Sequence, residues 1–185
     1  MMLHKLFFVI WFFLPAALAN TAPVVVSKVP FLKKFTQPVD FGKSWRGKRI
    51  FGDHKTIRGF VAGILTGIGI ALLQLHFYNA SADLRDLIPI DYNELNVALF
   101  GGISAFGALL GDSVKSFFKR RSGVKPGQSW FPFDQVDYIF GGVLATMLFL
   151  RLEYVDYLLL FVVYFILHPL STVTGYLLKL KDSPI

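Results

Sequence analysis

Residues 95–121 read LNVALFGGISAFGALLGDSVKSFFKRR. The first 16 of these residues carry no charge, whereas the last ten contain Asp112 and four basic residues. A helix that crosses a bilayer needs about 20 mostly apolar residues, because its backbone must satisfy its own hydrogen bonds in hydrocarbon. We therefore predict a membrane span over residues 95–118, with the charged last turns at a membrane surface.

Four more stretches have the composition of a span, at residues 3–26, 57–78, 136–151 and 154–178. The first contains Pro15 and Pro23, and the fourth predicted span, 136–151, is short. The chain is 54% hydrophobic and only 17% charged, against about 25% charged residues in soluble domains. It has no Cys, which excludes a disulfide scaffold, a thiolate zinc site and a Cys nucleophile. The prediction is a single all-α integral membrane domain, residues 1–185, with about five transmembrane helices.

Basic residues are concentrated in three segments of this chain, whose net charge is +7. Nine lie in residues 27–58, five in 115–125 and two in the tail, so these segments hold 16 of the 19 Lys and Arg residues. Five spans place all three on one side, which the positive-inside rule makes cytoplasmic. The predicted orientation is N-out and C-in in the cell membrane, with cytoplasmic loops at 27–56 and 119–135.

The first hydrophobic segment has an alternative interpretation. Lys5, an apolar run over residues 6–14 and the small residues Ala17 and Ala19 are typical of a signal peptide with its cleavage site. Cleavage would leave the basic segment 27–58 to begin outside the cell, against the positive-inside rule. The spanning interpretation is therefore favoured.

Glycines recur every four residues in two predicted spans. Gly59, Gly63 and Gly67 share one helix face, and so do Gly107 and Gly111. Small residues at this spacing let helix backbones approach closely. We expect tight packing within the chain, with a homodimer interface as the alternative.

The end of the span over 95–118 carries residues capable of chemistry. Asp112, Ser116 and Lys119 lie at i, i+4 and i+7, which is one stripe of a helix. An Asp one turn inside a span is costly and usually faces a polar cavity or a partner. A simpler interpretation is an Asp112–Lys115 or Asp112–Lys119 ion pair, with the basic side chains reaching toward the interface.

Two more acids begin the next span. Asp134 and Asp137 are three residues apart, so both carboxylates can lie on one helix face. Acids at a helix start also stabilise its N-terminus, which is the alternative role. With Asp112 they form three carboxylates at one membrane depth among basic residues. Oxygen ligands of this kind suit Mg²⁺ together with substrate phosphates.

Residues 41–59 form a basic, glycine-rich segment before the second span. It contains Lys55 and Thr56 directly before the helix, but no Walker A pattern, so a P-loop NTPase is excluded. Polyphosphate binding requires accessible backbone N–H groups, positive charge and a helix N-terminus. The alternative is a juxtamembrane segment attracted to anionic lipid. Combined with the acids, the segment favours a metal-dependent site for a phosphorylated ligand.

The motifs resemble the signature of the membrane CTP:phosphatidate cytidylyltransferases, the CDP-diacylglycerol synthases. The resemblance rests on Lys55-Thr56-x-x-Gly59, then Gly111-Asp112-x-x-x-Ser116-x-x-Lys119-Arg120-x-x-Gly123-x-Lys125, then Asp134-x-x-Asp137. Pro126 stands where that branch has Asp, Gln135 replaces an Arg, and the Pro-Gly-His-Gly-Gly stretch is absent. These departures and the short chain favour the archaeal-type branch, so the sequence resembles the CDP-archaeol synthases more closely.

The resemblance implies a nucleotidyltransferase that moves CMP from CTP to a lipid phosphate, unsaturated archaetidic acid, and releases pyrophosphate. It also implies site residues: Mg²⁺ on Asp112, Asp134 and Asp137, and substrate contacts through Lys55, Thr56, Ser116, Lys119, Arg120 and Lys125. The implied partners are CTP, the lipid phosphate and membrane lipids. Nucleic acid is not expected, because topology explains the basic charge.

Two alternatives to this function stay open. The same chemistry on phosphatidate would give CDP-diacylglycerol, since the sequence does not determine ether against ester lipid. A non-enzymatic protein that binds anionic lipid would explain the charge and the spans, but not the three acids placed among the bases.

Overall fold

The structure is a computed structural model that describes residues 2–124 and 128–180. Its long helices are α1 (Met2–Lys28), α2 (Ile57–Ala80), α4 (Val97–Arg121) and α6 (Tyr154–Leu177). Shorter elements are the 3₁₀ turn η1 (Pro30–Leu32), the strands β1 (Ser44–Trp45) and β2 (Lys48–Arg49), and the helices α3 (Ala82–Leu87) and α5 (Phe133–Thr146). The predicted all-α class is confirmed, with one small antiparallel hairpin between the first two long helices.

Polar side chains fix where three of these helices begin. Thr56, Ser81 and Asn96 precede α2, α3 and α4, and each side chain accepts a hydrogen bond from the backbone N–H three residues later. Such caps satisfy N–H groups that have no partner within the first helical turn. The start of α2 directly after Thr56 therefore follows from local sequence.

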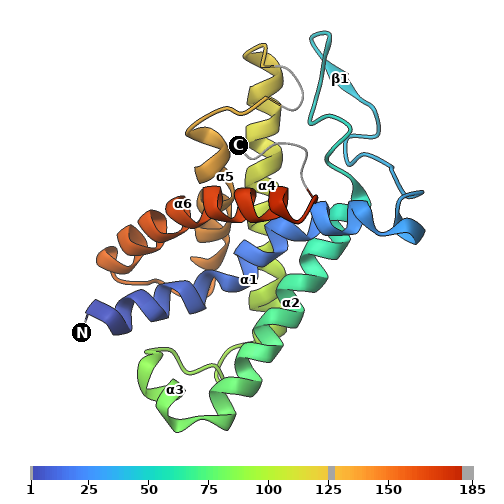
Figure 1. The fold of residues 1–185 in the computed structure, drawn as a ribbon. Coiled ribbons are helices and arrows are strands. Elements are labelled where there is room, and N and C mark those ends of the chain that lie inside the picture. Colours follow the sequence, from blue (N-terminus) through green and yellow to red (C-terminus); the bar gives the residue numbers. More distant parts are fainter. Residues whose placement is uncertain (1, 125–127, 181–185) are drawn as a thin grey trace.

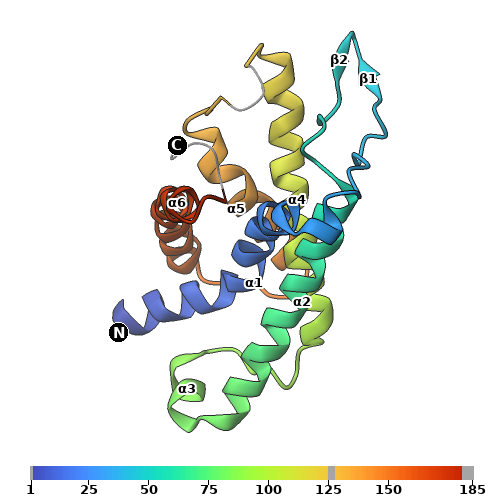
Figure 2. The same ribbon diagram turned by 45° about the vertical axis from the view of Figure 1, so that its right-hand side comes forward.

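Helix α1 lies across the middle of the bundle and contacts α2, α4, α5 and α6. Figures 1 and 2 show α1 crossing α2 and α4, which run side by side, while α6 lies on its other side. Its buried residues are mostly aromatic or small: Phe8, Val9, Phe12, Phe13, Ala16, Ala19 and Ala22. The first segment therefore packs as part of the helical bundle.

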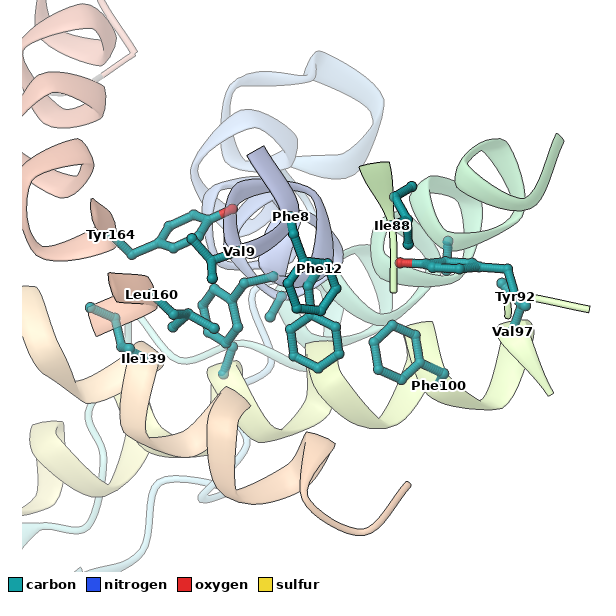
Figure 3. Close-up of a cluster of buried hydrophobic side chains, with 14 of the residues drawn as sticks. Phe8, Val9, Phe12, Ile88, Tyr92, Val97, Phe100, Ile139, Leu160 and Tyr164 are labelled. Carbon is teal, nitrogen blue, oxygen red and sulfur yellow. The ribbon is translucent and has the colours of Figure 1, made fainter. Parts of the chain in front are cut away.

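Aromatic and aliphatic side chains converge around α1 from several elements (Figure 3). Phe12 meets Phe100 of α4 with ring centroids 5.5 Å apart, and Phe13 meets Tyr164 of α6 at 4.9 Å. Figure 3 shows Tyr164 and Leu160 of α6 pointing toward Val9 of α1, while Phe8 lies beside Phe12. Aromatic pairs contribute beyond their buried area, so these contacts hold α1 between the other helices.

Helix α1 contains Pro15, which cannot donate the usual hydrogen bond to the carbonyl of Trp11. The side-chain amide of Gln74 on α2 donates to that carbonyl at 2.6 Å. Nearby, the Tyr164 hydroxyl donates to the Ile10 carbonyl, also at 2.6 Å. Backbone groups left without a partner inside a membrane are costly, so Gln74 of α2 compensates for the proline here.

Glycines bring neighbouring helix backbones into direct contact. A Cβ added at Gly67 on α2 would stand 2.6 Å from the Gly101 carbonyl oxygen on α4. On the other side of α4, Gly107 and Gly111 meet Gly141 of α5, where an added Cβ would overlap backbone atoms. The expected packing within the chain is confirmed for both glycine faces, because their close contacts are made inside one chain. A homodimer stays a prediction.

Four described helices, α1, α2, α4 and α6, are long and apolar enough to cross a membrane. Helix α5 has 14 residues, so its axis is about 21 Å long, against about 30 Å of hydrocarbon. The fourth predicted span, 136–151, instead begins as a helix at Phe133 and ends at Thr146, followed by turns. The sequence pattern placed the C-terminal end of this helix too far along the chain. The residues directly after Thr146 are still apolar, but they are not helical.

The helices also expose large apolar side chains along their outer faces. The exposed set includes Val61, Leu65, Leu72, Phe106, Leu110, Phe140, Leu144, Leu158, Val162 and Ile166. Soluble monomers rarely show contiguous apolar surface of this extent. The surface therefore suits a lipid environment, as expected for an integral membrane protein.

The two ends of the bundle have different loops. The hairpin β1–β2 and the last turns of α4 lie at one end, and α3 lies at the other (Figures 1 and 2). After α5, residues 147–153 lead to the start of α6. Lys5 and Glu153 meet at the far end, 2.5 Å apart. The basic segments 27–56 and 119–124 therefore share one end, as the charge pattern predicts.

Candidate active site

Three carboxylates and three ammonium groups meet around the last turns of α4, between the residue that precedes the N-cap of α2 and the first turns of α5. Asp112 of α4 pairs with Lys55, the residue just before the N-cap of α2. Its other carboxylate oxygen lies 3.1 Å from Nζ of Lys115, one turn later on α4. The predicted Asp112–Lys115 ion pair is thus present, but it is one contact of a larger cluster.

The two acids of α5 reach the same lysine. Nζ of Lys115 lies 2.6 Å from Oδ1 of Asp134 and 2.8 Å from Oδ2 of Asp137. Lys119 donates to both oxygens of Asp134, at 3.1 and 2.9 Å. The Asp112–Lys119 pair proposed as an alternative is replaced by Lys119–Asp134.

This cluster is mostly buried, with side-chain exposures of 14% for Lys115 and 5% for Asp137. Charges removed from water are tolerated only where they are paired and hydrogen-bonded. Three carboxylates and three ammonium groups balance formally. The pairing explains how so many charged residues persist at this depth.

Backbone contact between α4 and α5 creates this arrangement. A Cβ on Gly111 would overlap the carbonyl of Asp137, so only glycine permits the observed approach. Asp112 follows Gly111 directly on α4, and Asp137 is the residue of α5 that Gly111 contacts. The glycine contact therefore brings Asp112 and Asp137 to the same lysine, Lys115. The predicted glycine face and the predicted acid cluster are parts of the same feature.

Three other predicted site residues make no ion pair with the three acids in the part of the chain that the structure describes. The Ser116 hydroxyl donates to the Asp112 carbonyl at 2.9 Å, and the Thr56 hydroxyl caps α2. Nε of Arg120 is buried and donates to no residue that the structure describes. Lys125 lies outside the described residues. Each role predicted for these four residues stays a prediction.

Asp40 organises the basic segment between α1 and α2, and sequence reasoning did not single it out as a site residue. Its buried carboxylate accepts hydrogen bonds from the backbone N–H groups of Gly42, Phe51 and Gly52 and from Arg49. Burial opposes ionisation, but these hydrogen bonds outweigh it and lower the pKa of Asp40 to about 2. The available sequence signal was an acidic residue, Asp40, at the start of a segment rich in glycine and basic residues.

The organised segment is attached to the end of α4. Trp45 stacks on Phe117 with centroids 5.6 Å apart, and Nζ of Lys48 donates to the Arg121 carbonyl at 3.0 Å. The guanidinium of Arg121 lies 3.3 Å from the Phe117 ring centroid. The hairpin thereby stands over the basic end of the bundle, close to the charged cluster.

Two cavities flank α4 at the cluster. The more polar of the two, called the polar pocket below, has a volume of about 520 Å³ and is lined by Lys55, Asp112, Arg58 and residues of α1, including Asn20. An apolar groove of about 880 Å³ lies between α4 and α5, with Lys115 and Asp137 among its few polar residues. Asp112 therefore faces the polar pocket, whereas Lys115 faces the groove.

Comparison with known proteins identifies the family. The sequence profile of the CarS-like family, described as CDP-archaeol synthase, matches residues 2–185. This chain belongs to the CarS-like family of CDP-archaeol synthases. The archaeal-type resemblance predicted from the motifs is thus confirmed.

Individual members of this family align over most of the chain. The CDP-archaeol synthase of Pyrococcus furiosus is 32% identical over 183 residues, covering 98% of this chain and 99% of the relative. The one from Methanospirillum hungatei JF-1 is 40% identical over 154 residues, covering 80% and 89%. A solved structure, described as an intramembrane enzyme for archaeal membrane lipid biosynthesis, matches with a TM-score of 0.71 and 29% identity, over 89% of this chain and 92% of that chain.

The three predicted Mg²⁺ ligands come together in this member of the CDP-archaeol synthase family. The cation that they surround in this structure is the ammonium group of Lys115. Among residues 2–124 and 128–180, no group of three or more acidic or His side chains is arranged to hold a metal ion. The donor chemistry nevertheless fits Mg²⁺, because all three predicted carboxylates face one cationic atom. Oδ2 of Asp137 is buried and accepts no well-directed hydrogen bond from any described residue.

Proposed function

We propose that this protein transfers CMP from CTP to the phosphate of unsaturated archaetidic acid and releases CDP-archaeol and pyrophosphate. The observation that carries this proposal is the charged cluster between a polar pocket and an apolar groove. A transfer between a nucleotide and a membrane lipid needs two such compartments that meet at one reacting centre. Membership in the CDP-archaeol synthase family supports the choice of substrates.

The polar pocket is the candidate site for CTP. Lys55 and Arg58 line it at the start of α2, where backbone N–H groups of a helix N-terminus favour an anion. Its volume of about 520 Å³ is within the range of ligand sites. We assign the triphosphate to the end of this pocket near Lys55 and Asp112.

The apolar groove is the candidate site for the lipid. It follows α4 from Ile103 to Ser122, and Phe140 and Leu144 of α5 form part of its opposite wall. The distance along the helix axis from Ile103 to Ser122 is about 28 Å, close to the thickness of the hydrocarbon core. An isoprenoid chain in this groove would place the lipid phosphate near Lys115.

The reaction joins one oxygen of the lipid phosphate to the α-phosphorus of CTP. The bond from that phosphorus to the bridging oxygen breaks, and pyrophosphate leaves with the electron pair. No general base is required, because the lipid phosphate is already anionic near neutral pH. Lys119, Arg120 and Lys125 would neutralise phosphate oxygens during the transfer.

Mg²⁺ is the cofactor that we propose, with Asp112, Asp134 and Asp137 as its protein ligands. When bound, Mg²⁺ supplies charge neutralisation to the transferring phosphoryl group. Thr56 caps the N-terminus of α2 beside the pocket. Ser116, whose hydroxyl now donates to the Asp112 carbonyl, would orient a bound ligand after giving up that contact.

An assay with purified protein tests the function. Protein, CTP and Mg²⁺ are mixed with unsaturated archaetidic acid or with phosphatidate, and pyrophosphate and CDP-lipid are measured. We expect equal amounts of both products, faster turnover with the ether lipid, and loss of turnover with EDTA that excess Mg²⁺ restores. Turnover with phosphatidate alone would replace the proposed acceptor, and no pyrophosphate with either lipid would favour the non-enzymatic alternative.

The cytoplasmic orientation of the site is also a proposal, and the Cys-free chain makes it testable. Lys48 lies in the hairpin at the basic end, and Asn93 is exposed in the loop at the other end. We expect an impermeant maleimide to label Asn93→Cys in intact cells, and Lys48→Cys only after the membrane is opened. The reverse pattern would overturn the orientation.

A further inference from the structure

Lys115 differs from the other lysines of the cluster in the number of carboxylates that it contacts. Its ammonium lies within 3.1 Å of all three acids, at 3.1, 2.6 and 2.8 Å from Asp112, Asp134 and Asp137. In the part of the chain that the structure describes, Lys55 pairs with Asp112 only and Lys119 with Asp134 only. Lys115 is thus the cation at the centre of the acids.

An ammonium group has three N–H donors and no acceptor. Lys115 donates one of them to Oδ1 of Asp134 at 2.6 Å, and Asp112 and Asp137 lie in ion-pair contact with the same ammonium. While the three carboxylates hold this ammonium among them, it is kept away from a phosphate. The same three carboxylates are the proposed ligands of a divalent cation. Two cations a few ångströms apart repel strongly in a site that excludes water, so Lys115 and a divalent ion exclude each other.

The direction in which Lys115 can move follows from its position. Its side chain is flexible and already lines the apolar groove, on the α4 face that carries Val114 and Phe118. Rotation of this side chain toward the groove takes the ammonium away from the carboxylates. It then becomes one of the few positive groups at the polar end of an otherwise apolar channel.

We propose that Lys115 is an internal counter-ion that holds the three carboxylates before a divalent cation binds and, once displaced, binds the phosphate of the acceptor lipid in the groove. This inference rests on the proposed function and deepens it. It couples the two substrate compartments, because the lipid phosphate gains its positive partner only after the metal has bound. The metal and its nucleotide would therefore bind before the lipid.

This role makes an unusual prediction for Lys115→Met. Removing the ammonium leaves the carboxylates without their central cation, so affinity for a divalent ion rises although a contact is lost. The acceptor phosphate loses a charge-assisted hydrogen bond, so KM for the lipid rises while KM for CTP changes little. A merely structural lysine would weaken both properties together.

The test uses full-length protein in detergent, without nucleotide or lipid, and measures Mn²⁺ binding by electron paramagnetic resonance of the unbound ion. We expect Lys115→Met to bind Mn²⁺ about tenfold more tightly than the unmodified chain, and Lys119→Met to change affinity by less than about threefold. With saturating CTP, we expect the lipid KM of Lys115→Met to rise at least about tenfold. Lys115→Arg, which retains the charge, should restore weak Mn²⁺ binding.

Each outcome decides one part of the inference. Unchanged or weaker Mn²⁺ binding by Lys115→Met overturns the counter-ion role, and an unchanged lipid KM overturns the acceptor role. Lys115→Gln provides the same comparison if the Met variant fails to fold. Failure of the proposed function is a separate result, since it would appear as absent CTP turnover in the unmodified chain, whereas Mn²⁺ binding is measured without turnover.

Discussion

The two ends of this bundle each hold a lysine between carboxylates, but the surroundings differ. At the far end, Nζ of Lys5 lies 2.5 Å from Glu153 and 3.2 Å from Asp156, and it ties the start of α1 to the start of α6. At the basic end, Lys115 contacts three acids that are mostly buried. Glu153, in contrast, is 73% exposed.

Cavities distinguish the two clusters further. The pocket beside Lys5 has a volume of about 450 Å³ and contains His4, Asp86 and Arg151. The basic end instead has a polar pocket and a long apolar groove on opposite sides of α4. Both clusters contain acids and a lysine, so that composition alone does not indicate function. The cluster at the basic end is informative because it lies between two cavities of different polarity.

The largest expected effect comes from the acids of α5. Asp134→Asn and Asp137→Asn retain the side-chain shape but remove the charge, so turnover should fall at least about 1,000-fold while the protein stays folded. Asp156→Asn is the matched control at the far end and should change turnover less than about twofold. Pyrophosphate release and thermal unfolding measure the two properties. Near-normal turnover in either α5 variant would refute the metal assignment.

A smaller effect is expected from Asp40, which organises the basic segment but does not contact the cluster. In Asp40→Asn, a side-chain N–H group faces backbone N–H donors, so the hydrogen bonds that hold the segment are weakened. We expect trypsin to cleave the segment about 5- to 30-fold faster. Asp53→Asn is the control, because its carboxylate is 79% exposed and contributes little. Equal cleavage of both variants would show that the segment does not depend on Asp40.

The pKa of Asp40 adds a pH dependence to this prediction. Its folded value of about 2 is below the ordinary 3.8, so ionised Asp40 stabilises the segment above about pH 4. That contribution is lost as the pH falls through about 2. Trypsin is inactive there, so pepsin cleavage between pH 4 and pH 2 provides the measurement. We expect cleavage of segment 29–56 to accelerate over this range less in Asp40→Asn than in the unmodified chain.

The smallest effect is expected for Lys5→Met at the far end. The lysine and Glu153 are accessible to water, where ion pairs contribute little. Tm should fall slightly, because α1 and α6 lose one connection, and turnover should stay within about twofold of the unmodified chain. A loss of turnover as large as that of the α5 variants would mean that the comparison between the ends is mistaken.

Much of the candidate site was accessible from local sequence. The spacing of Asp134 and Asp137, the position of Asp112 at the end of a span, and Lys55 before a helix each have a local signature. Local spacing also predicted the Asp112–Lys115 pair, but not the partners of the other charges. Lys119 was expected near Asp112 but pairs with Asp134, because the choice depends on how α4 and α5 cross.

The end of α5 and the role of Lys115 were also outside the reach of pattern reasoning. Apolar composition continues past Thr146, whereas the helix ends there. Lys115 is one of four basic residues in the last ten of residues 95–121, and local spacing indicates only its pairing with Asp112. Its contact with three acids appears only when two helices are placed together.

The sequence by itself determined that this is a membrane protein, that its basic loops share one end, and which acids stand among them. These properties follow from hydropathy and charge, which each segment carries independently of the others. Only the tertiary structure decided that Asp112, Asp134 and Asp137 surround Lys115. That arrangement depends on backbone contact between Gly111 and Asp137, and such contact arises from the fit of two helix surfaces rather than from either sequence alone.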